Sequence, residues 1–152
     1  MRQDYAISAD ALASVLDSAV LAARNGGTEI CGLLVAQGHG LLTPLMLRNK
    51  ARRAGIWAFY VGEVRTAVAQ AARNGHEVVG TFHSHPVGTA VPGSSDIANA
   101  LDDSLILIID CTTKRYALWH IKSGAAQQRR LVTRLTSIAA KLILDPLAPN
   151  ML

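Results

Sequence analysis

The residues best suited to chemistry lie in one short stretch, GTFHSHPVGTAVPGSSD, at positions 80–96. His83 and His85 are two positions apart, and side chains two apart along a strand project from the same face. Two imidazoles placed in this way can bind one metal ion together. Pro86 favours the end of the strand, because proline removes a backbone donor and restricts the residue before it. The spacing therefore predicts a strand that ends on two potential metal ligands.

A carboxylate follows the histidines after a loop rich in proline and glycine. The loop at 87–93 turns the chain back, and Asp96 is expected in the first turn of a short helix over 94–101. The positive end of a helix favours a carboxylate there, from where it can return to the histidines. Two imidazoles, one carboxylate and a position open to water make up a hydrolytic zinc site. The alternative is two strand-end histidines and an aspartate that only caps the helix, and the His-x-His pattern alone does not separate the two.

A second carboxylate upstream favours the hydrolytic interpretation. Glu29 opens the apolar stretch EICGLLVA at 29–36, which is predicted to be a strand. A water activated by a metal needs a base that takes its proton and later delivers it to the leaving group, and a carboxylate beside the metal can do both. By itself Glu29 is equally an ordinary charge at a strand edge. Together with the histidines, it is a candidate for this base.

Taken together, these segments resemble the JAMM, or MPN-plus, metalloprotease domain. TEICGLLV, the later VVGTFHSHP and a downstream aspartate are similar to the family's early glutamate, its His-x-His-Pro and its Asp near a helix start. Arg48-Asn49 and the helix end at Asn74-Gly75-His76 also look like family landmarks, so the resemblance covers most of the chain. It implies a single MPN/JAMM domain over 1–152, of the α/β (α+β) class, with a curved mixed β-sheet flanked by helices in a cytidine-deaminase-like arrangement.

Carried over residue by residue, the resemblance implies a zinc enzyme. His83, His85 and Asp96 would bind one Zn²⁺, and Glu29 would act as general base and then acid. The implied reaction is hydrolysis of an amide, typically the isopeptide bond after the C-terminal glycine of ubiquitin or a ubiquitin-like protein. Zinc would polarise the water and the scissile carbonyl, with no covalent intermediate. The expected partners are a ubiquitin-like protein or its conjugates.

One position departs from the family pattern. The family places a serine three residues before the aspartate, and this chain has Gly93 there, followed by Ser94 and Ser95. The spacing from His85 to Asp96 is kept, so the metal ligands are expected to be intact. Ser94 is the candidate for the hydroxyl that stabilises the oxyanion, and a backbone N–H is the alternative donor. Both serines could instead simply cap the helix that follows.

Three functions are compatible with this pattern. The first is an isopeptidase that removes or matures a ubiquitin-like modifier. The second is the same chemistry on a sulfur-carrier protein or a small peptide-like conjugate, and the third is a non-catalytic MPN scaffold. The complete Glu, His, His and Asp set favours the two enzymes. Eukaryotic deubiquitinating relatives carry insertions that grip a second ubiquitin, and the short segments here leave little space for them, which favours a minimal, bacterial-type enzyme.

Composition sets the broad class of the protein. At 152 residues, half of them hydrophobic, the chain is the right size for one domain with a core. No apolar run approaches the roughly 20 residues that cross a bilayer, and the N-terminus lacks a signal-peptide pattern, so we expect a soluble, cytoplasmic protein. Cys31 and Cys111 do not indicate a disulfide framework. The net charge of +4 comes without basic clusters interleaved with aromatics, which disfavours nucleic acid and leaves an acidic protein partner open.

Hydrophobic periodicity predicts the elements that must position these residues. Ser8 is expected to cap a helix over 9–24 that ends at Asn25-Gly26-Gly27, and a second helix is expected over 63–73. Further strands are predicted at 41–48, after the tight turn QGHG, and at 57–61, 77–85, 104–110 and 115–121, with a last strand after Arg129 and an amphipathic helix around 135–144. Three aromatic residues either line a substrate groove or belong to the core: Trp57, Phe59 and Tyr60.

Overall fold

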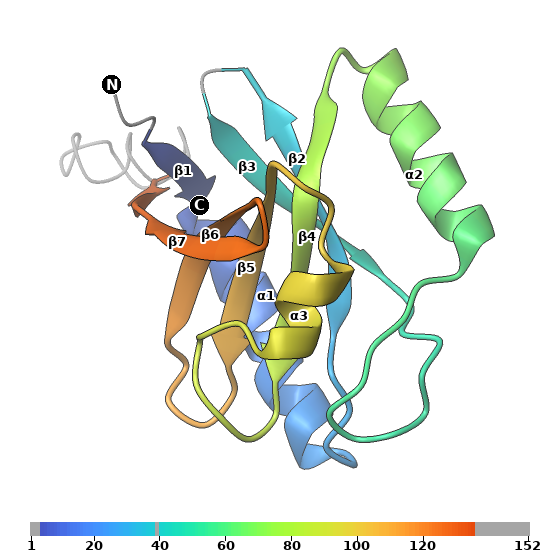
Figure 1. Cartoon of the computed structure of the whole chain (residues 1–152), viewed down its shortest axis with the longest axis vertical. Helices are drawn as coiled ribbons and strands as arrows, with labels where there is room; N and C mark the ends of the chain where they lie inside the picture. Colours follow the sequence, from blue (N-terminus) through green and yellow to red (C-terminus); the bar gives the residue numbers. More distant parts are fainter. Residues whose placement is uncertain (1–3, 39, 136–152) are drawn as a thin grey trace, which may run out of the picture.

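A computed structural model describes residues 4–38 and 40–135 of the chain. Within these residues the strands form one curved, mixed sheet in the order β7-β6-β5-β4-β2-β3-β1-β8 (Figure 1). The strands are β1 Tyr5–Ser8, β2 Cys31–Gln37, β3 Leu41–Leu47, β4 Glu77–His85, β5 Ser104–Asp110, β6 Tyr116–Lys122, β7 Ala125–Arg129 and β8 Leu131–Arg134. The helices are α1 Ala9–Arg24, α2 Val61–Arg73 and α3 Ser94–Asn99.

The centre of the sheet is the parallel pair formed by β4 and β5. All five residues of β5 from Leu105 to Ile109 are buried, as expected for a strand covered on both faces. Gly80 of β4 lies opposite Leu105, and a Cβ at Gly80 would lie 1.9 Å from the Leu105 carbonyl oxygen. The absence of a side chain at Gly80 thus lets the two backbones approach. This pairing holds β4, and therefore its two histidines, in the middle of the sheet.

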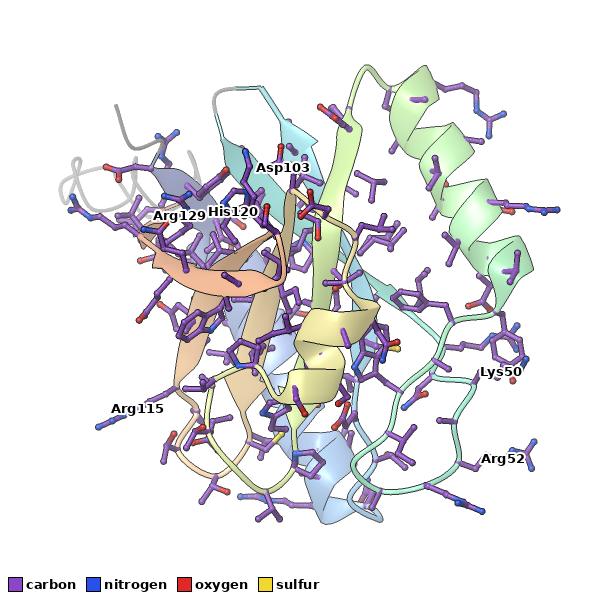
Figure 2. The ribbon with its side chains drawn as sticks, viewed as in Figure 1. Lys50, Arg52, Asp103, Arg115, His120 and Arg129 are labelled. Atoms are coloured by element: carbon purple, nitrogen blue, oxygen red, sulfur yellow. The ribbon has the colours of Figure 1, made fainter. Side chains whose placement is uncertain are left out.

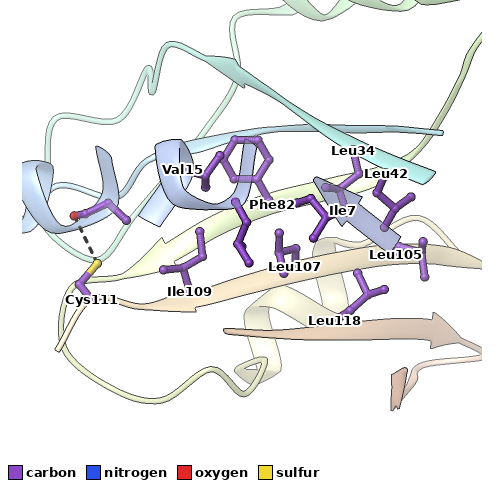
Figure 3. Packing of buried hydrophobic residues seen from close by; sticks show 12 residues of the cluster. Ile7, Val15, Leu34, Leu42, Phe82, Leu105, Leu107, Ile109, Cys111 and Leu118 are labelled. Carbon is purple, nitrogen blue, oxygen red and sulfur yellow. Dashed lines mark hydrogen bonds between the residues drawn. The ribbon is translucent and has the colours of Figure 1, made fainter. Parts of the chain in front are cut away.

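The two faces of the sheet have different roles. Leu12, Val15 and Ala19, spaced as one face of a helix, are buried in α1. In the main core, residues of α1 pack with Phe82 and Leu107 (Figure 3). Burying each large side chain of this kind contributes roughly 1.5–3 kcal/mol to folding. Figure 1 shows α1 and α3 on opposite faces, with α2 beside the strands β3 and β4.

Several predicted elements are confirmed. Ser8 accepts a hydrogen bond from the Ala11 N–H at 3.1 Å and caps a helix with the predicted bounds. The strands predicted at 77–85 and 104–110 are β4 and β5, and β2 and β3 form the predicted hairpin. The strand expected at 115–121 is displaced by one residue, to 116–122. The short helix ends at 99 rather than 101.

Other predictions are wrong at the level of single elements. The segment 57–61 is not a strand, because its backbone bonds to a polar side chain instead of a neighbouring strand, and Val61 already begins α2. Glu29 precedes β2, which begins at Cys31. The parallel strand β1 was not anticipated, since a strand of four residues carries little periodicity. The strand expected after Arg129 is β8, and the amphipathic helix around 135–144 falls almost entirely outside the described residues.

None of the helices in the described parts of the chain is both long and apolar enough to cross a bilayer.

Candidate metal centre

Three potential metal ligands converge at the end of β4. The Nε2 atoms of His83 and His85 lie 3.1 Å apart. Asp96 Oδ1 lies 3.1 Å from His83 Nε2, and Asp96 Oδ2 lies 3.4 Å from His85 Nε2. One ligand atom from each residue can be chosen so that all three lie within 4.8 Å of one another. The structure therefore brings together the three residues that the sequence predicted as ligands.

Alternation along β4 separates the histidines from the main core. Phe82 and Ser84 are fully buried, and Phe82 belongs to the α1 side of the sheet. His83 and His85 consequently project from the opposite face. His83 is fully buried, whereas about a sixth of the His85 side chain, 17%, is exposed. The pair is thus anchored inside the protein on one side and accessible on the other.

The ligands are oriented by backbone groups of the loop that returns from β4 to α3. His85 Nδ1 lies 2.7 Å from the carbonyl oxygen of Thr89, so Nδ1 carries the proton and Nε2 is left to face the site. Asp96 Oδ2 accepts a hydrogen bond from the Gly93 N–H at 2.7 Å. The predicted reversal of the chain is therefore stabilised by the ligands themselves.

The electrostatics of the three residues favour binding of a cation. Burial by itself raises the pKa of the Asp96 carboxyl, but hydrogen bonds from His83 and His85 outweigh it and hold this pKa well below its usual range. The hydrogen bond to Asp96 raises the pKa of His85, and the Thr89 carbonyl adds to this effect. A divalent cation suits this arrangement, because it satisfies the carboxylate and both imidazole lone pairs at once.

Trp57 holds the buried histidine from its other side. Its ring stacks on the His83 ring with 5.2 Å between centroids and an interplanar angle of 27°. His83 Nδ1 is buried and has no hydrogen-bond partner among the described residues. A metal-binding histidine is usually fixed by a second hydrogen bond, so stacking on Trp57 takes that role here. Trp57 therefore lies directly against one of the candidate ligands.

Glu29 is a buried carboxylate beside these ligands. Only 6% of the residue is exposed, and its Oε2 has no hydrogen-bond partner among the described residues. Desolvation raises the pKa of Glu29 from 4.5 to about 7, with opposing effects from the charges of His85 and Asp96. A carboxylate of this pKa can both accept and return a proton near neutral pH. The chemistry suggested by its sequence position is therefore compatible with its environment.

Ser84, the residue between the two histidines, helps to position Glu29. Its Oγ accepts a hydrogen bond from the Ile30 N–H at 2.9 Å, and its N–H donates to the Ile30 carbonyl at 3.1 Å. The chain just before β2 is thereby tied to β4 at the level of the metal ligands. This role of Ser84 was not predicted from the sequence, where the only available signal was strand alternation, which directs Ser84 away from the histidines.

Asn49 is a second residue whose role was not predicted. Its Nδ2 donates to the carbonyls of Glu29 and Ile56, each at 3.0 Å. Its Oδ1 accepts from the N–H groups of Ala51 at 2.9 Å and Ala58 at 3.1 Å. Two of these partners flank Trp57 in sequence. One side-chain amide thus fixes both the residue that carries the buried carboxylate and the loop that carries Trp57.

Ser94 and Ser95 do not take the helix-capping role considered for them. Gly93, not a serine, is the N-cap of α3, and no side chain caps this helix. Ser94 and Ser95 are both exposed in its first turn. The N–H of Gly93 is already bonded to Asp96, so this particular backbone donor is engaged. A Cβ at position 93 would lie 3.4 Å from Asp96 Oδ2, an ordinary van der Waals distance, so the position of Asp96 does not require glycine there.

We predict that zinc stabilises the protein through these ligands. At a free zinc concentration of about 100 times Kd, binding to the folded state adds roughly 2.7 kcal/mol to the free energy of unfolding. This gain is expected to disappear in His83→Ala and Asp96→Asn and to persist in His120→Ala, a histidine outside the site. Denaturant titration with zinc and with chelator measures it, and an undiminished gain in both ligand variants would contradict the assignment.

Replacement of Glu29 should change how stability depends on pH in the metal-free protein. Because the folded-state pKa of about 7 lies above the ordinary 4.5, folding binds a proton between these values and wild-type stability falls as the pH rises through them. Glu29→Gln has no such group. Relative to wild type it should gain roughly 2–3 kcal/mol between pH 5 and pH 8. Urea titrations in chelator test this, and a difference that does not vary with pH would refute it.

Asn49→Ala should both destabilise the protein and change the environment of Trp57, because the Asn49 amide bonds to the loop that carries Trp57. Four backbone groups lose their partner, for which we expect a loss of about 2–3 kcal/mol and a shift in tryptophan fluorescence. Asn74→Ala, at the exposed end of α2, is the matched control and should stay within about 0.5 kcal/mol of wild type. Equal effects of the two substitutions would show that the amide of Asn49 has no special role.

Comparison with known proteins places this chain among relatives of known family. The family model described as prokaryotic homologs of the JAB domain matches residues 12–122. A desampylase from Pyrococcus furiosus is 25% identical over 95 residues, which cover 62% of this chain and 68% of the relative. These similarities support a hydrolase of the JAMM type.

Solved structures show the same fold. A protein from Desulfitobacterium hafniense, determined in solution, has a TM-score of 0.70 and 24% identity, covering 87% of this chain and 94% of its own. A JAB1/MPN domain protein from Archaeoglobus fulgidus has a TM-score of 0.52 and 17% identity, with 85% and 97% covered. A structure described as a metalloprotease-like zinc site in the proteasome and signalosome has a TM-score of 0.50 and 16% identity, with 85% and 98% covered. The chain belongs to the JAB/MPN family, among the prokaryotic homologs of the JAB domain.

Proposed function

We propose that this protein is a zinc-dependent hydrolase that cleaves the amide bond after the C-terminal glycine of a ubiquitin-like protein. The observation that carries the proposal is a buried glutamate with a pKa of about 7 beside a cluster of two histidines and an aspartate. Neither feature alone indicates hydrolysis. Together they supply a cation site and a group that can exchange protons near neutral pH.

The side chains divide the work of the reaction. His83, His85 and Asp96 hold the zinc ion, which when bound acts as a Lewis acid toward water and the scissile carbonyl. Glu29 takes the proton of the attacking water and delivers it to the leaving amine. Burial favours this role, because the neutral and ionised forms of Glu29 are then both accessible near pH 7. Trp57 covers His83 and limits the access of further water to the ligands.

The developing negative charge on the substrate carbonyl requires a donor. We propose Ser94 as this donor, because it is exposed and is the first residue of α3, two positions before Asp96. The N–H of Gly93 is the less favourable choice, since it already donates to Asp96. A hydroxyl at this position contributes through preorganised hydrogen bonding as the charge forms.

The substrate class follows from the family and from one relative. The similar protein from Pyrococcus furiosus is named a desampylase, which supports a ubiquitin-like modifier as substrate here. A sulfur-carrier protein with a C-terminal glycine would present the same type of bond. Both cysteines are free and buried, which fits a reducing compartment, and we propose the cytoplasm as the place of action.

Hydrolysis can be tested with a ubiquitin-fold protein that ends in Gly-Gly and is fused to a C-terminal peptide, alongside a lysine-linked conjugate. We expect cleavage that requires zinc. In Glu29→Gln the rate should fall by about 10²–10⁴-fold with unchanged zinc content, whereas Glu77→Gln, an exposed glutamate at the other end of β4, should match wild type.

Two results would overturn the proposal. Cleavage that continues in Glu29→Gln or after removal of zinc would exclude this mechanism. A folded, zinc-loaded protein that cleaves neither substrate would favour the non-catalytic scaffold.

A further inference from the structure

The ends of several strands meet beside the metal centre. β4 and β5 run in parallel toward the metal centre, so their last residues, His85 and Asp110, lie at the site end of the sheet. β2 is antiparallel to β4 and begins there, with Cys31 paired to His83. The connection from β3 to α2 leaves from the same end, because Leu47 pairs with Cys31. The turn between β5 and β6 also lies there.

Exposed cations surround this end of the sheet. We call them the basic rim, and all of its members are exposed: Arg24, Lys50, Arg52, Arg53, Lys114 and Arg115. Figure 2 shows Lys50 and Arg52 on one side and Arg115 on the other side of the end where β4 and β5 finish. Within the described residues, none of the six forms an ion pair.

The carboxylates nearest the metal centre are engaged in other interactions. Glu29 and Asp96 belong to the site. Glu63 pairs with Arg48, and Asp110 accepts hydrogen bonds from the Thr112 N–H and the Thr113 hydroxyl. No Asp or Glu occurs in the range 30–62, which contains half of the rim.

The exposed carboxylates of the sheet lie at the opposite end. Glu77 begins β4, and Asp102 and Asp103 precede β5. In Figure 2, Asp103 lies far from Arg52 and Arg115, next to His120 and Arg129. His120 Nε2 lies 2.7 Å from Asp103 Oδ1, and Lys122 pairs with the same carboxylate. The basic rim therefore gives an excess of positive charge to the end that a substrate must approach.

The loop that carries half of the rim is fixed to the site. Asn49 bonds to Ala51 and Ala58 within the loop, and the Lys50 N–H donates to the Ala58 carbonyl at 2.8 Å. Trp57 of this loop stacks on the ligand His83. A substrate protein that binds Lys50 and Arg52 is thus held beside the metal centre, because the loop that carries them has a defined conformation. Preorganisation of this kind lowers the cost of binding.

We infer that the basic rim binds an acidic surface of the substrate protein while the substrate's C-terminal tail reaches the metal centre. The inference rests on the proposed function and narrows it: among ubiquitin-fold proteins, those with acidic residues around the base of the tail are selected. Complementary charge accelerates the encounter and suppresses wrong partners, and both effects weaken with salt.

Binding measurements test the rim without requiring hydrolysis. The probe is a fluorescent ubiquitin-fold protein with an acidic surface that ends in Gly-Gly, and a second version has its surface Asp and Glu changed to Asn and Gln. The rim variant is Arg52→Glu/Arg53→Glu. The control is Arg73→Glu/Arg134→Glu, which changes net charge equally at the exposed end of α2 and at the far edge of the sheet. All are used with zinc, after comparison of their unfolding midpoints.

In low salt the rim variant should bind the acidic probe about 10-fold more weakly than wild type, and the control should stay within about 2-fold. Near 0.5 M salt, where the screening length is only about 4 Å, the difference should largely vanish. The neutralised probe should not distinguish the variants.

Equal weakening by both double variants, or no weakening by either, would refute the role of the rim. So would rim-dependent binding of a short DNA duplex in preference to the acidic probe. If the rim result holds and zinc-dependent cleavage is absent, the proposed hydrolysis fails and the binding surface stands. If all variants cleave the peptide fusion at the same rate and binding does not depend on the rim, the role of the rim fails and the proposed hydrolysis stands.

Discussion

The alternation of side chains along β4 is the constraint on which the rest of the site depends. Consecutive residues of a strand point to opposite faces, so Phe82 enters the main core while His83 faces the site. Ser84, pointing back, bonds to Ile30 and brings the chain that carries Glu29 to the level of the histidines. A shift of one residue in the register of β4 would place the ligands in the core and Phe82 in the site. The register of β4 therefore determines both the packing of the core and the assembly of the site.

Burial of Glu29 raises its pKa and lowers the stability of the folded protein. An isolated carboxylate inside a protein is unfavourable in its charged form, and the structure offers Glu29 Oε2 no compensating hydrogen bond among the described residues. The consequence is a pKa of about 7 in place of 4.5. Asp96 is the opposite case, since two histidines stabilise its charge despite partial burial. Two neighbouring carboxyl groups thus differ in pKa because their surroundings differ.

Interactions outside the ligand set maintain these surroundings. Asn49 links the backbone at Glu29 to the loop that places Trp57, and the stacked Trp57 ring substitutes for the missing hydrogen bond at His83 Nδ1. The same loop carries cations to the edge of the site. Its irregular backbone is therefore required, because a regular strand at 57–61 would direct these backbone groups to a neighbouring strand instead of Asn49.

The sequence by itself indicated three candidate ligands, a candidate base and the main elements. His83, His85 and Asp96 follow from local spacing, and α1, β4 and β5 follow from periodicity and caps, which are properties of neighbouring residues. Tertiary structure decided the rest, since it brings together residues far apart in the chain. It alone showed that Glu29 is desolvated, that Asn49 joins two segments, and that the cations of three separate segments meet at one end of the sheet. Strand direction and register set these relations, and no short stretch of sequence encodes them.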